Sequence, residues 1–269
     1  MSQEEGSQGN VSFLAEGENI LLVDNRGRRY LVELKSGGEF HCHSGVIRHD
    51  QIIGSSEGSE FRTASNAKFI GLRPTINDHV LKMPRGAQVI YPKDLGAILI
   101  LADIAAGQKV FESGLGSGAL STALLRCGVD IVGYEIREDF AETAISNVAQ
   151  FLGQEALQRY HVSIKDAYEE HSDANFDRAV LDLPEPWQVV PHLEQSLRSG
   201  GILVAYNPSI IQVQTLRRQL SNGPWAMVET IEVLHRSWHV EGHAVRPDHR
   251  MVAHTGFLTH ARLIESCFK

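Results

Sequence analysis

The sequence lacks the features that mark membrane-spanning and disulfide-stabilised proteins. No run of eighteen or more apolar residues occurs, so no transmembrane helix is expected. The three cysteines, Cys42, Cys127 and Cys267, are too few and too scattered for a disulfide framework. The N-terminal segment is acidic and polar, and it lacks the basic and apolar regions of a signal peptide. These absences predict a cytoplasmic protein with reduced thiols.

Positive charge is also scarce, because the net charge of the 269 residues is −8 at pH 7. This argues against a protein that coats nucleic acid without specificity. It does not exclude an enzyme that acts on nucleic acid, since local charge decides that interaction. Charge alone favours a solvated surface of mixed sign as the explanation of the small basic groups: Arg26, Arg28 and Arg29; Arg73, Lys82, Arg85 and Lys93; Arg217 and Arg218.

The sequence gives no clear metal-binding pattern. The histidines late in the chain match no ligand spacing, and no cysteine pair accompanies them: His235, His239, His243, His249, His254 and His260. In the tract His41-Cys42-His43, alternation along a strand would send the side chains to opposite faces. We therefore assign no metal ligand.

The pattern of apolar residues and turns changes along the chain and predicts two domains. Between residues 19 and 48, short apolar runs alternate with turns, which predicts a small antiparallel β module. The segment Gly54–Gly58 is typical of a loop or linker. We expect a small N-terminal β domain with its linker over residues 1–72 and a second domain over residues 73–269.

The second domain shows strands alternating with helices, which predicts a parallel sheet covered on both faces. The expected strands are 109–111, 130–134, 161–164, 178–181 and 202–206. The expected helices are 119–126, 139–152, 189–197 and 210–220. No crossover helix is evident between the last apolar runs, 227–233 and 257–264, so we expect an antiparallel pair at the sheet edge.

A glycine-rich loop, Glu112-Ser113-Gly114-Leu115-Gly116-Ser117-Gly118, lies between the first strand and helix of this domain. Glycines let the chain turn sharply and bring bare backbone against a ligand. The spacing differs from the dinucleotide fingerprint because the third glycine comes one residue early. A tight turn without a ligand is the alternative interpretation.

Glu135 supports a ligand-binding loop. It ends the next strand at the spacing after Gly114 where an acidic residue receives both ribose hydroxyls. A nicotinamide cofactor and S-adenosylmethionine both carry such a ribose. Glu112 would repel a pyrophosphate but can lie near the amine of a methionine moiety, so S-adenosylmethionine is favoured.

Two further aspartates follow predicted strands at the edge where ligands bind in open parallel sheets. Asp166, in Lys165-Asp166-Ala167, can accept from the exocyclic amine of adenine, or it can cap a turn. Asp182 opens the segment Asp182-Leu183-Pro184-Glu185-Pro186-Trp187 and should face a bound cofactor, with helix capping as the alternative. Exocyclic-amine methyltransferases usually carry Asn/Asp-Pro-Pro-aromatic here, so methylation of a ring nitrogen is favoured.

The chain resembles the bacterial and archaeal tRNA (adenine-N1)-methyltransferases that act at position 58 of the T loop. The resemblance spans about residues 70 to 264. One departure, Ser113-Gly114-Leu115 in place of Ala-Gly-Thr or Ala-Gly-Ala, leaves the three glycines and Ser117 intact. The matching segments are Arg73-Pro74-Thr75, Met83–Asp94, Gly114–Leu120, Asp177–Trp187, Arg236–Trp238, Arg246-Pro247 and His254–Leu258.

The resemblance implies a Rossmann-like class I methyltransferase domain with a mostly parallel seven-stranded sheet, a small N-terminal β domain and a homotetramer. It implies tRNA as substrate and S-adenosylmethionine as cofactor. Glu135 would bind the ribose, Asp166 and Ala167 would lie near the adenine, and Asp182 would lie between cofactor and target base. Tyr91 would border the base pocket. The remaining cofactor contacts would be Gly114, Gly116, Ser117, Gly118, Ala119 and Leu120.

The chemistry of such a site is methylation at N1 of adenine, which carries a free lone pair and needs no general base. Asp182 can accept from the N6 amine and offset the positive charge that develops on the base. Tyr91 can stack on the base, although ordinary packing beside Pro92 explains it as well. The base must leave its pairing in folded tRNA. Activity should persist well below neutral pH, until Asp182 is protonated.

Three other functions stay open at this point. A nicotinamide-dependent dehydrogenase could use the same ribose carboxylate, although no catalytic Tyr-Lys or His pair is evident. A methyltransferase of another substrate would share the same cofactor site. A non-catalytic tRNA-binding subunit would be expected to have lost residues such as Gly114, Glu135 and Asp182, which are present.

Overall fold

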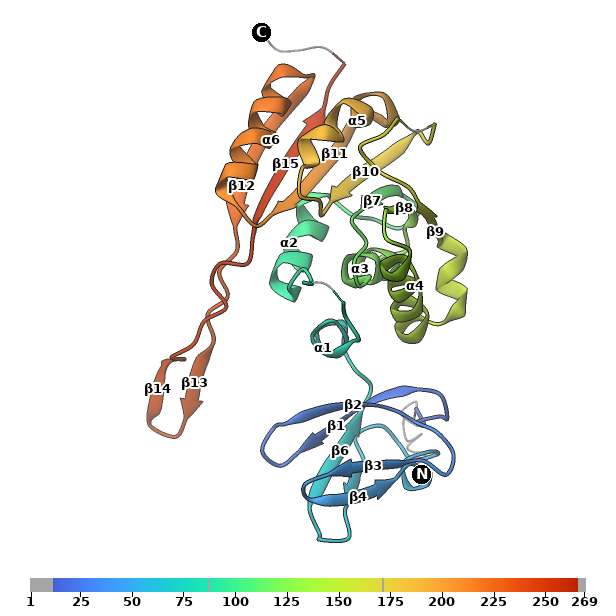
Figure 1. The fold of residues 1–269 in the computed structure, drawn as a ribbon. Helices are drawn as coiled ribbons and strands as arrows, with labels where there is room; N and C mark the ends of the chain where they lie inside the picture. The colour runs from blue at the N-terminus through green and yellow to red at the C-terminus, as the bar shows by residue number, and fades with distance from the viewer. Residues whose placement is uncertain (1–11, 87, 171, 266–269) are drawn as a thin grey trace, which may run out of the picture. The chain divides into compact units, whose positions relative to one another are not determined.

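The computed structural model describes residues 12–86, 88–170 and 172–265. Contacts divide the chain into two compact units, Met1–Lys82 and Met83–Lys269 (Figure 1). The first unit includes the helix α1 (Ile76–Lys82), which lies beyond the domain boundary expected between residues 72 and 73. That boundary stays a prediction. Cys42 and Cys127 are free thiols, and Cys267 lies outside the described residues.

The first unit is the small β domain that the sequence predicts. Four strands form an antiparallel sheet in the order β2-β1-β6-β5, and β3 pairs with β4 separately. A 3-10 helix, η1 (His49–Gln51), follows β4. The strands are β1 (Asn19–Asp24), β2 (Arg29–Glu33), β3 (Glu39–Cys42), β4 (Gly45–Arg48), β5 (Glu60–Arg62) and β6 (Lys68–Leu72).

The core of this unit explains why the chain after residue 54 belongs to it. Ile20 and Leu22 of β1 pack with Phe61 of β5 and Phe69 of β6, and all four are buried. Gly58 N donates to the Gly71 carbonyl at 2.8 Å, so the loop turns the chain back into the sheet. Gly54–Gly58 is thus a loop, as predicted, and the alternative of a linker is wrong.

The second unit contains a seven-stranded sheet in the order β12-β15-β11-β10-β7-β8-β9. The five strands from β11 to β9 are parallel, and only β15 runs antiparallel to its neighbours. This confirms the predicted mostly parallel sheet. The strands are β7 (Lys109–Ser113), β8 (Asp130–Glu135), β9 (Tyr160–Ile164), β10 (Phe176–Leu181), β11 (Leu197–Asn207), β12 (Trp225–Glu232) and β15 (Phe257–Leu263).

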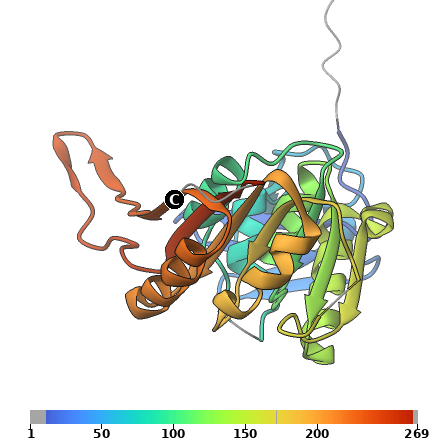
Figure 2. The ribbon, with the colours of Figure 1, turned by 90° about the horizontal axis from the view of Figure 1, so that it is seen from above.

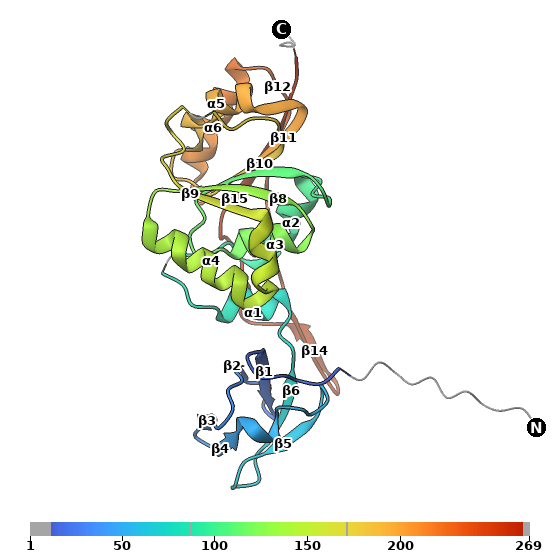
Figure 3. The ribbon, with the colours of Figure 1, turned by 90° about the vertical axis from the view of Figure 1, so that its right-hand side faces the viewer.

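Helices cover this sheet in two groups. The helix α3 contacts both α2 and α4, whereas α6 contacts strands β11, β12 and β15 (Figures 1 and 3). The 3-10 helices are η2 (Gln154–Arg159) and η3 (Pro186–Gln188). The α-helices are α2 (Pro92–Leu101), α3 (Ala119–Arg126), α4 (Glu138–Leu152), α5 (Val190–Ser196) and α6 (Ile210–Asn222).

The antiparallel pair at the end of the chain is confirmed, with one correction to its place. β12 pairs with β15, with Ile231 opposite Leu258, but β15 also pairs with β11. Only β12 therefore lies at the edge, whereas β15 is interior, which fits the buried side chains of Leu258, Ala261 and Leu263.

A hairpin that the sequence did not predict extends from this unit between β12 and β15, as Figure 2 shows. It consists of β13 (Trp238–Glu241) and β14 (Ala244–Pro247). Val240 lies opposite Val245 and Trp238 opposite Pro247, so these apolar residues share one face of the ribbon. Trp238, Val240 and Val245 are 59%, 66% and 62% exposed.

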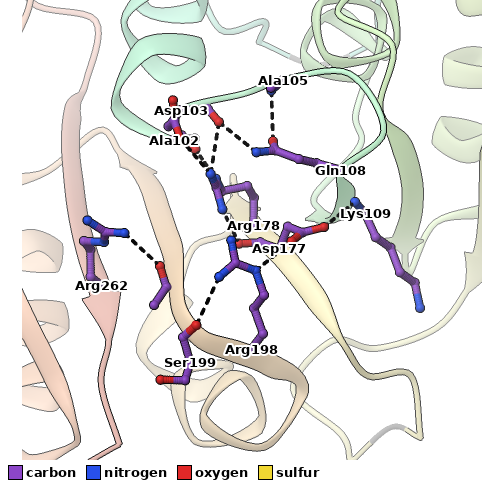
Figure 4. A network of polar contacts seen from close by, with 11 residues as sticks. Ala102, Asp103, Ala105, Gln108, Lys109, Asp177, Arg178, Arg198, Ser199 and Arg262 are labelled. Carbon is purple, nitrogen blue, oxygen red and sulfur yellow. Dashed lines mark hydrogen bonds and ion pairs between the residues drawn. The ribbon is translucent and has the colours of Figure 1, made fainter.

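At the amino-terminal edge of the sheet, Arg178 of β10 anchors the end of α2 (Figure 4). Its guanidinium donates to the carbonyl of Ala102 and, at 2.9 Å, to the Asp103 carboxylate. Asp177 beside it accepts from Lys109 N at 2.9 Å and from Arg198 Nε at 2.7 Å. This network joins α2, β7, β10 and β11 at the edge opposite the glycine-rich loop.

Candidate functional site

The glycine-rich loop joins β7 to α3, and its glycines adopt backbone conformations that other residues avoid. Gly114, Gly116 and Gly118 have φ of 83°, 52° and 77°. A Cβ on Gly114 would lie 2.0 Å from the Asp182 carbonyl oxygen. A Cβ on Gly118 would lie 2.9 Å from Ala144. The glycines thus permit both the turn and the close approach of β10 and α4.

The carboxyl ends of four neighbouring parallel strands bring the predicted residues into one row. In the order β10-β7-β8-β9, these ends carry Asp182, the glycine-rich loop, Glu135 and Asp166. Backbone hydrogen bonds continue past the strands: Asp182 N donates to Ser113 O at 2.9 Å and Lys165 N to Glu135 O at 3.1 Å. The row is continuous along the edge where ligands bind in such sheets.

Glu135 is held beneath the loop by backbone donors. Its carboxylate accepts from Gly116 N at 3.2 Å and from Arg137 N at 3.0 Å, and the residue is 7% exposed. Asp166 accepts from Tyr168 N at 2.9 Å, which is the turn hydrogen bond that the alternative interpretation predicted. Ala167 beside it is buried. Asp166 therefore has a structural role whether or not it also contacts a ligand.

A small pocket opens at the glycine-rich loop. Six of the predicted site residues line it, namely Gly114, Gly116, Ser117, Ala119, Leu120 and Asp182. Leu115 and three residues from the segment before α2, namely Gln88, Val89 and Ile90, complete the lining. Tyr91 is the next residue in the chain, at the N-cap position of α2, and is not among the lining residues.

Asp182 does not cap the helix that follows it. The residue before η3 is Glu185, whose side chain makes no capping hydrogen bond. Asp182 is partly exposed, yet protein surrounds its carboxyl group, and this burial together with the charge of Glu135 raises its pKa to about 7. The capping alternative is therefore wrong.

Glu112 is a buried acid that the sequence places beside the loop but that was not predicted among the cofactor-binding residues. Burial is the main cause that raises its pKa to about 8, and Asp182 and Glu135 add to the shift. Its Oε1 accepts from Ser121 Oγ at 2.9 Å, and Tyr160 OH donates to Ser121 Oγ at 2.8 Å. Its Oε2 has no hydrogen-bond partner among the described residues.

These features suit a ligand with positive charge and hydroxyl groups. Three carboxyl groups lie at this one loop, those of Glu112, Glu135 and Asp182. The charges of Asp182 and Glu135 add to burial in raising the pKa of Glu112, and the charge of Glu135 adds to burial in raising that of Asp182. Ser117 Oγ is also buried and lacks a partner within the described part of the chain. A cation would stabilise the charged carboxylates, whereas a pyrophosphate would be repelled.

Some residues at the site were not predicted, although the sequence contains features that point to them. Gln88, Val89 and Ile90 belong to the segment Met83–Asp94, from which only Tyr91 was chosen. Asn147 of α4 was also missed; its Nδ2 donates to Pro84 O at 2.8 Å and to Ser117 O at 2.9 Å. A polar side chain on the buried face of an amphipathic helix was the available signal.

No group of three or more His, Cys, Asp or Glu side chains within the described ranges is arranged to hold a metal ion. No helix in the described part of the chain has the length and apolar character needed to cross a membrane.

Comparisons with known proteins agree with this geometry. The family model of the tRNA methyltransferase complex GCD14 subunit matches residues 69–246, and the TrmI-like N-terminal model matches residues 13–60. The chain is 35% identical to tRNA (adenine(58)-N(1))-methyltransferase TrmI of Thermus thermophilus, over 90% of this chain and 96% of the relative.

Two solved structures resemble the fold over nearly the whole chain. The tRNA (m1A58) methyltransferase TrmI from Aquifex aeolicus matches with a TM-score of 0.83 and 28% identity, covering 95% of this chain and 100% of that one. A SAM-dependent O-methyltransferase from Thermotoga maritima matches with a TM-score of 0.89 and 29% identity, covering 95% and 96%. The family models and the identity to TrmI agree, and the chain belongs to the TrmI family of tRNA (adenine(58)-N(1))-methyltransferases.

Proposed function

We propose that this protein transfers a methyl group from S-adenosylmethionine to N1 of adenine 58 in the T loop of tRNA. Family membership supports the activity and the substrate. The observation that carries the proposal is the row of strand ends, with Asp182, the glycine-rich loop, Glu135 and Asp166 in that order. This order fits an extended cofactor with its reactive centre near Asp182 and its adenine near Asp166.

The chain's own residues would hold the cofactor as follows. Glu135 accepts from both ribose hydroxyls, while Asp166 and Ala167 contact the adenine. Glu112 is the buried acid available to an ammonium group, and its free Oε2 supports that role. The backbone of the loop and the start of α3 contribute the remaining contacts, from Gly114, Gly116, Ser117, Gly118, Ala119 and Leu120. S-adenosylmethionine supplies a methyl group made electrophilic by the neighbouring sulfonium.

Asp182 orients the acceptor. Its carboxylate accepts a hydrogen bond from the N6 amine of adenine, which selects adenine over guanine by the direction of the bond. Methylation of N1 makes the base cationic, so an ionised Asp182 stabilises the charge that develops. No residue has to remove a proton from N1, and alignment of the reacting atoms becomes the main requirement.

Tyr91 is proposed as the aromatic wall on which the adenine stacks. Its place directly after the pocket-lining segment Gln88–Ile90 supports this role. Adenine 58 has to leave its pairing to reach Asp182, so base flipping or loop opening precedes the reaction.

The protein is also proposed to work as a homotetramer in the cytoplasm, where it meets tRNA. A net charge of −8 suits a tRNA enzyme poorly unless several subunits combine their basic groups. The hairpin β13–β14 supports self-association, because its exposed apolar face is suited to cover by a second copy.

The other functions are less well supported. A dehydrogenase would place a pyrophosphate beside Glu112 and Asp182, whose pKa values are already raised by burial and, to a lesser degree, by neighbouring negative charges. A non-catalytic subunit would leave the intact cofactor residues without a purpose. A methyltransferase of another substrate would share the cofactor site and differ in the acceptor.

Methyl transfer to tRNA transcripts separates these functions. We expect the enzyme to label an unmodified tRNA transcript from methyl-labelled S-adenosylmethionine, and to leave a matched transcript with guanine at position 58 unlabelled. Equal labelling of both transcripts would contradict adenine 58 as the target, and labelling of neither would contradict a tRNA methyltransferase.

A further inference from the structure

A polar cluster around a buried ion pair joins the start of α2 to the segment before β15. Lys93 Nζ donates to Asp94 Oδ1 at 2.8 Å and to Thr255 Oγ1 at 2.6 Å. Thr255 Oγ1 in turn donates to Asp94 Oδ2 at 2.7 Å. We name these three residues, Lys93, Asp94 and Thr255, the α2 clasp. The clasp links segments far apart in the chain, because its hydrogen bonds join residues that are 161 and 162 positions apart.

The clasp also reaches the end of β11. Tyr206 OH donates to the carbonyl of Thr255 at 2.6 Å. The next residue, Gly256, lies against the Tyr206 ring, because a Cβ there would be 2.4 Å from Cζ of the ring. The charges of Asp94, Asp182 and Tyr91 add to burial in raising the pKa of Tyr206 to about 12. The acceptor side of the proposed site therefore borders the clasp.

A contribution to the free energy of unfolding does not by itself explain why the α2 clasp is present. The side chains of Lys93 and Asp94 are 5% and 0% exposed, and burying two charges costs free energy that their attraction only partly returns. A buried ion pair with a further hydrogen-bond partner does fix the positions of the side chains, because all of its donors and acceptors are satisfied in only a few arrangements. Lys93 is too buried to contact tRNA, so a direct substrate role does not explain it.

The opposite end of α2 is anchored independently. Ala102 and Asp103, directly after the helix, accept from the guanidinium of Arg178 on β10 (Figure 4). With that end held, the clasp decides where the beginning of the helix lies. Tyr91 is the N-cap residue of the helix, two positions before Lys93.

We propose that the α2 clasp is a positioning device for the acceptor base: it holds Tyr91 at the start of α2 in register with the strand ends that carry Asp182 and Tyr206. The inference rests on the proposed function, because it takes Tyr91 as the residue that stacks on adenine. Thr255 is a positioning residue in this account, and it acts through Asp94 and Lys93 on Tyr91.

Thr255→Val tests the device with little change of shape, since it removes the hydroxyl and leaves the Lys93–Asp94 ion pair in place. We expect the single-turnover methylation rate at saturating tRNA and cofactor to fall about tenfold or more, because small displacements of reacting groups are costly. The affinity for S-adenosylhomocysteine should change less than threefold, as roughly expected for a distant site. Thr255→Ser keeps the hydroxyl and should restore most of the rate.

The matched control is Thr259→Val on β15. The Thr259 side chain is buried, and its hydroxyl lies 2.9 Å from the Thr230 hydroxyl, outside the α2 clasp. This variant should keep the wild-type rate even where its melting temperature falls as far as that of Thr255→Val. Equal loss of activity in both variants would overturn the inference. Thr255→Ala, which removes the same hydroxyl, serves if the valine variant does not fold.

A double-mutant cycle with Tyr91→Ala asks whether the clasp acts through Tyr91. We expect Thr255→Val to lower the rate far less in the Tyr91→Ala background than in the wild type, because the group being positioned is gone. Additive losses, or a wild-type rate for Thr255→Val, would overturn the inference. If the wild-type enzyme does not methylate tRNA at all, the proposed function fails instead.

Discussion

Three acidic residues at one glycine-rich loop support the kind of ligand that we propose for this protein. Glu112 and Asp182 have pKa values raised to about 8 and about 7, with burial as the first cause in both. A cation near these groups favours their ionised forms and is attracted to the resulting carboxylates. A sulfonium and an ammonium group in one cofactor meet this requirement, and a dinucleotide does not.

Glu135 is the residue whose loss should most weaken cofactor binding. For Glu135→Ala, we expect calorimetry to show at least about a tenfold loss of affinity for S-adenosylhomocysteine, because a charge-assisted hydrogen bond contributes roughly 1.5–3 kcal/mol. Glu138→Ala is the control, since Glu138 is an exposed acid in the first turn of α4. Unchanged affinity in Glu135→Ala would remove Glu135 from the ribose site.

Asp182 should affect the chemical step more than cofactor binding. Asp182→Ala is expected to lower the single-turnover rate by about 10²–10³, the usual effect of losing one preorganised electrostatic group. Asp182→Asn should be impaired as well, since its amide can accept from N6 but has no charge. The sequence predicts activity well below neutral pH, whereas the raised pKa of Asp182 moves the expected loss of activity upward, toward neutral pH.

The pH profile follows from the direction of this shift. The ionised form of Asp182 is the active one, and its pKa is about 7 in the free protein. At saturating cofactor, kcat/KM for tRNA should rise with pH to a plateau, with a midpoint below about 7, because the positive charge of the cofactor lowers this pKa. The measurement is made at saturating cofactor, so that the titration of Glu112 does not enter. The same rise in Asp182→Asn would assign it to another group.

At the scale of elements, the sequence predicted the helices and strands whose apolar, polar and glycine residues follow the pattern expected from their burial. The unit β7, glycine-rich loop and α3 was predicted because Lys109–Ser113 is apolar at its centre and glycines separate it from a helix of buried residues. The helix α2 was missed even though Pro92 stands at a position typical of a helix start. Gly96 and the apolar run Ile98–Leu101 gave it no helical period.

The hairpin β13–β14 was missed because its pairing has no core to reveal it. Its strands are four residues long, and its apolar side chains are exposed. Only the cross-strand register places them on one face. Apolar side chains that stay exposed within their own chain leave no pattern of burial in the sequence.

Charge on the apolar face of the hairpin should therefore disrupt assembly. For Val240→Lys combined with Val245→Lys, we expect light scattering to show a loss of the tetramer, because a second copy would have to bury two unpaired charges. Glu241→Lys, on the other face, should leave the mass unchanged. A wild-type protein that is already a 29.8 kDa monomer at micromolar concentration would contradict the proposed assembly.

At the scale of the whole molecule, the fold class and the row of residues at the strand ends were predictable, because strand ends and glycines have local signatures. The surroundings of Asp182 were not, since they are assembled by contacts such as Thr255 with Asp94 that span most of the second unit. The acidic net charge likewise said little about substrate. Substrate choice depends on which groups meet at the strand ends.

The most direct test of the account is the chemical identity of the methylated nucleoside. Unmodified tRNA transcript is incubated with the wild-type enzyme and S-adenosylmethionine, digested to nucleosides and analysed by mass spectrometry against standards, with Asp182→Ala as the matched reaction. The account predicts 1-methyladenosine, formed once per tRNA at position 58, and far less of it with Asp182→Ala. A methyl group on N6 of adenine, or a wild-type yield from Asp182→Ala in single turnover, would contradict it.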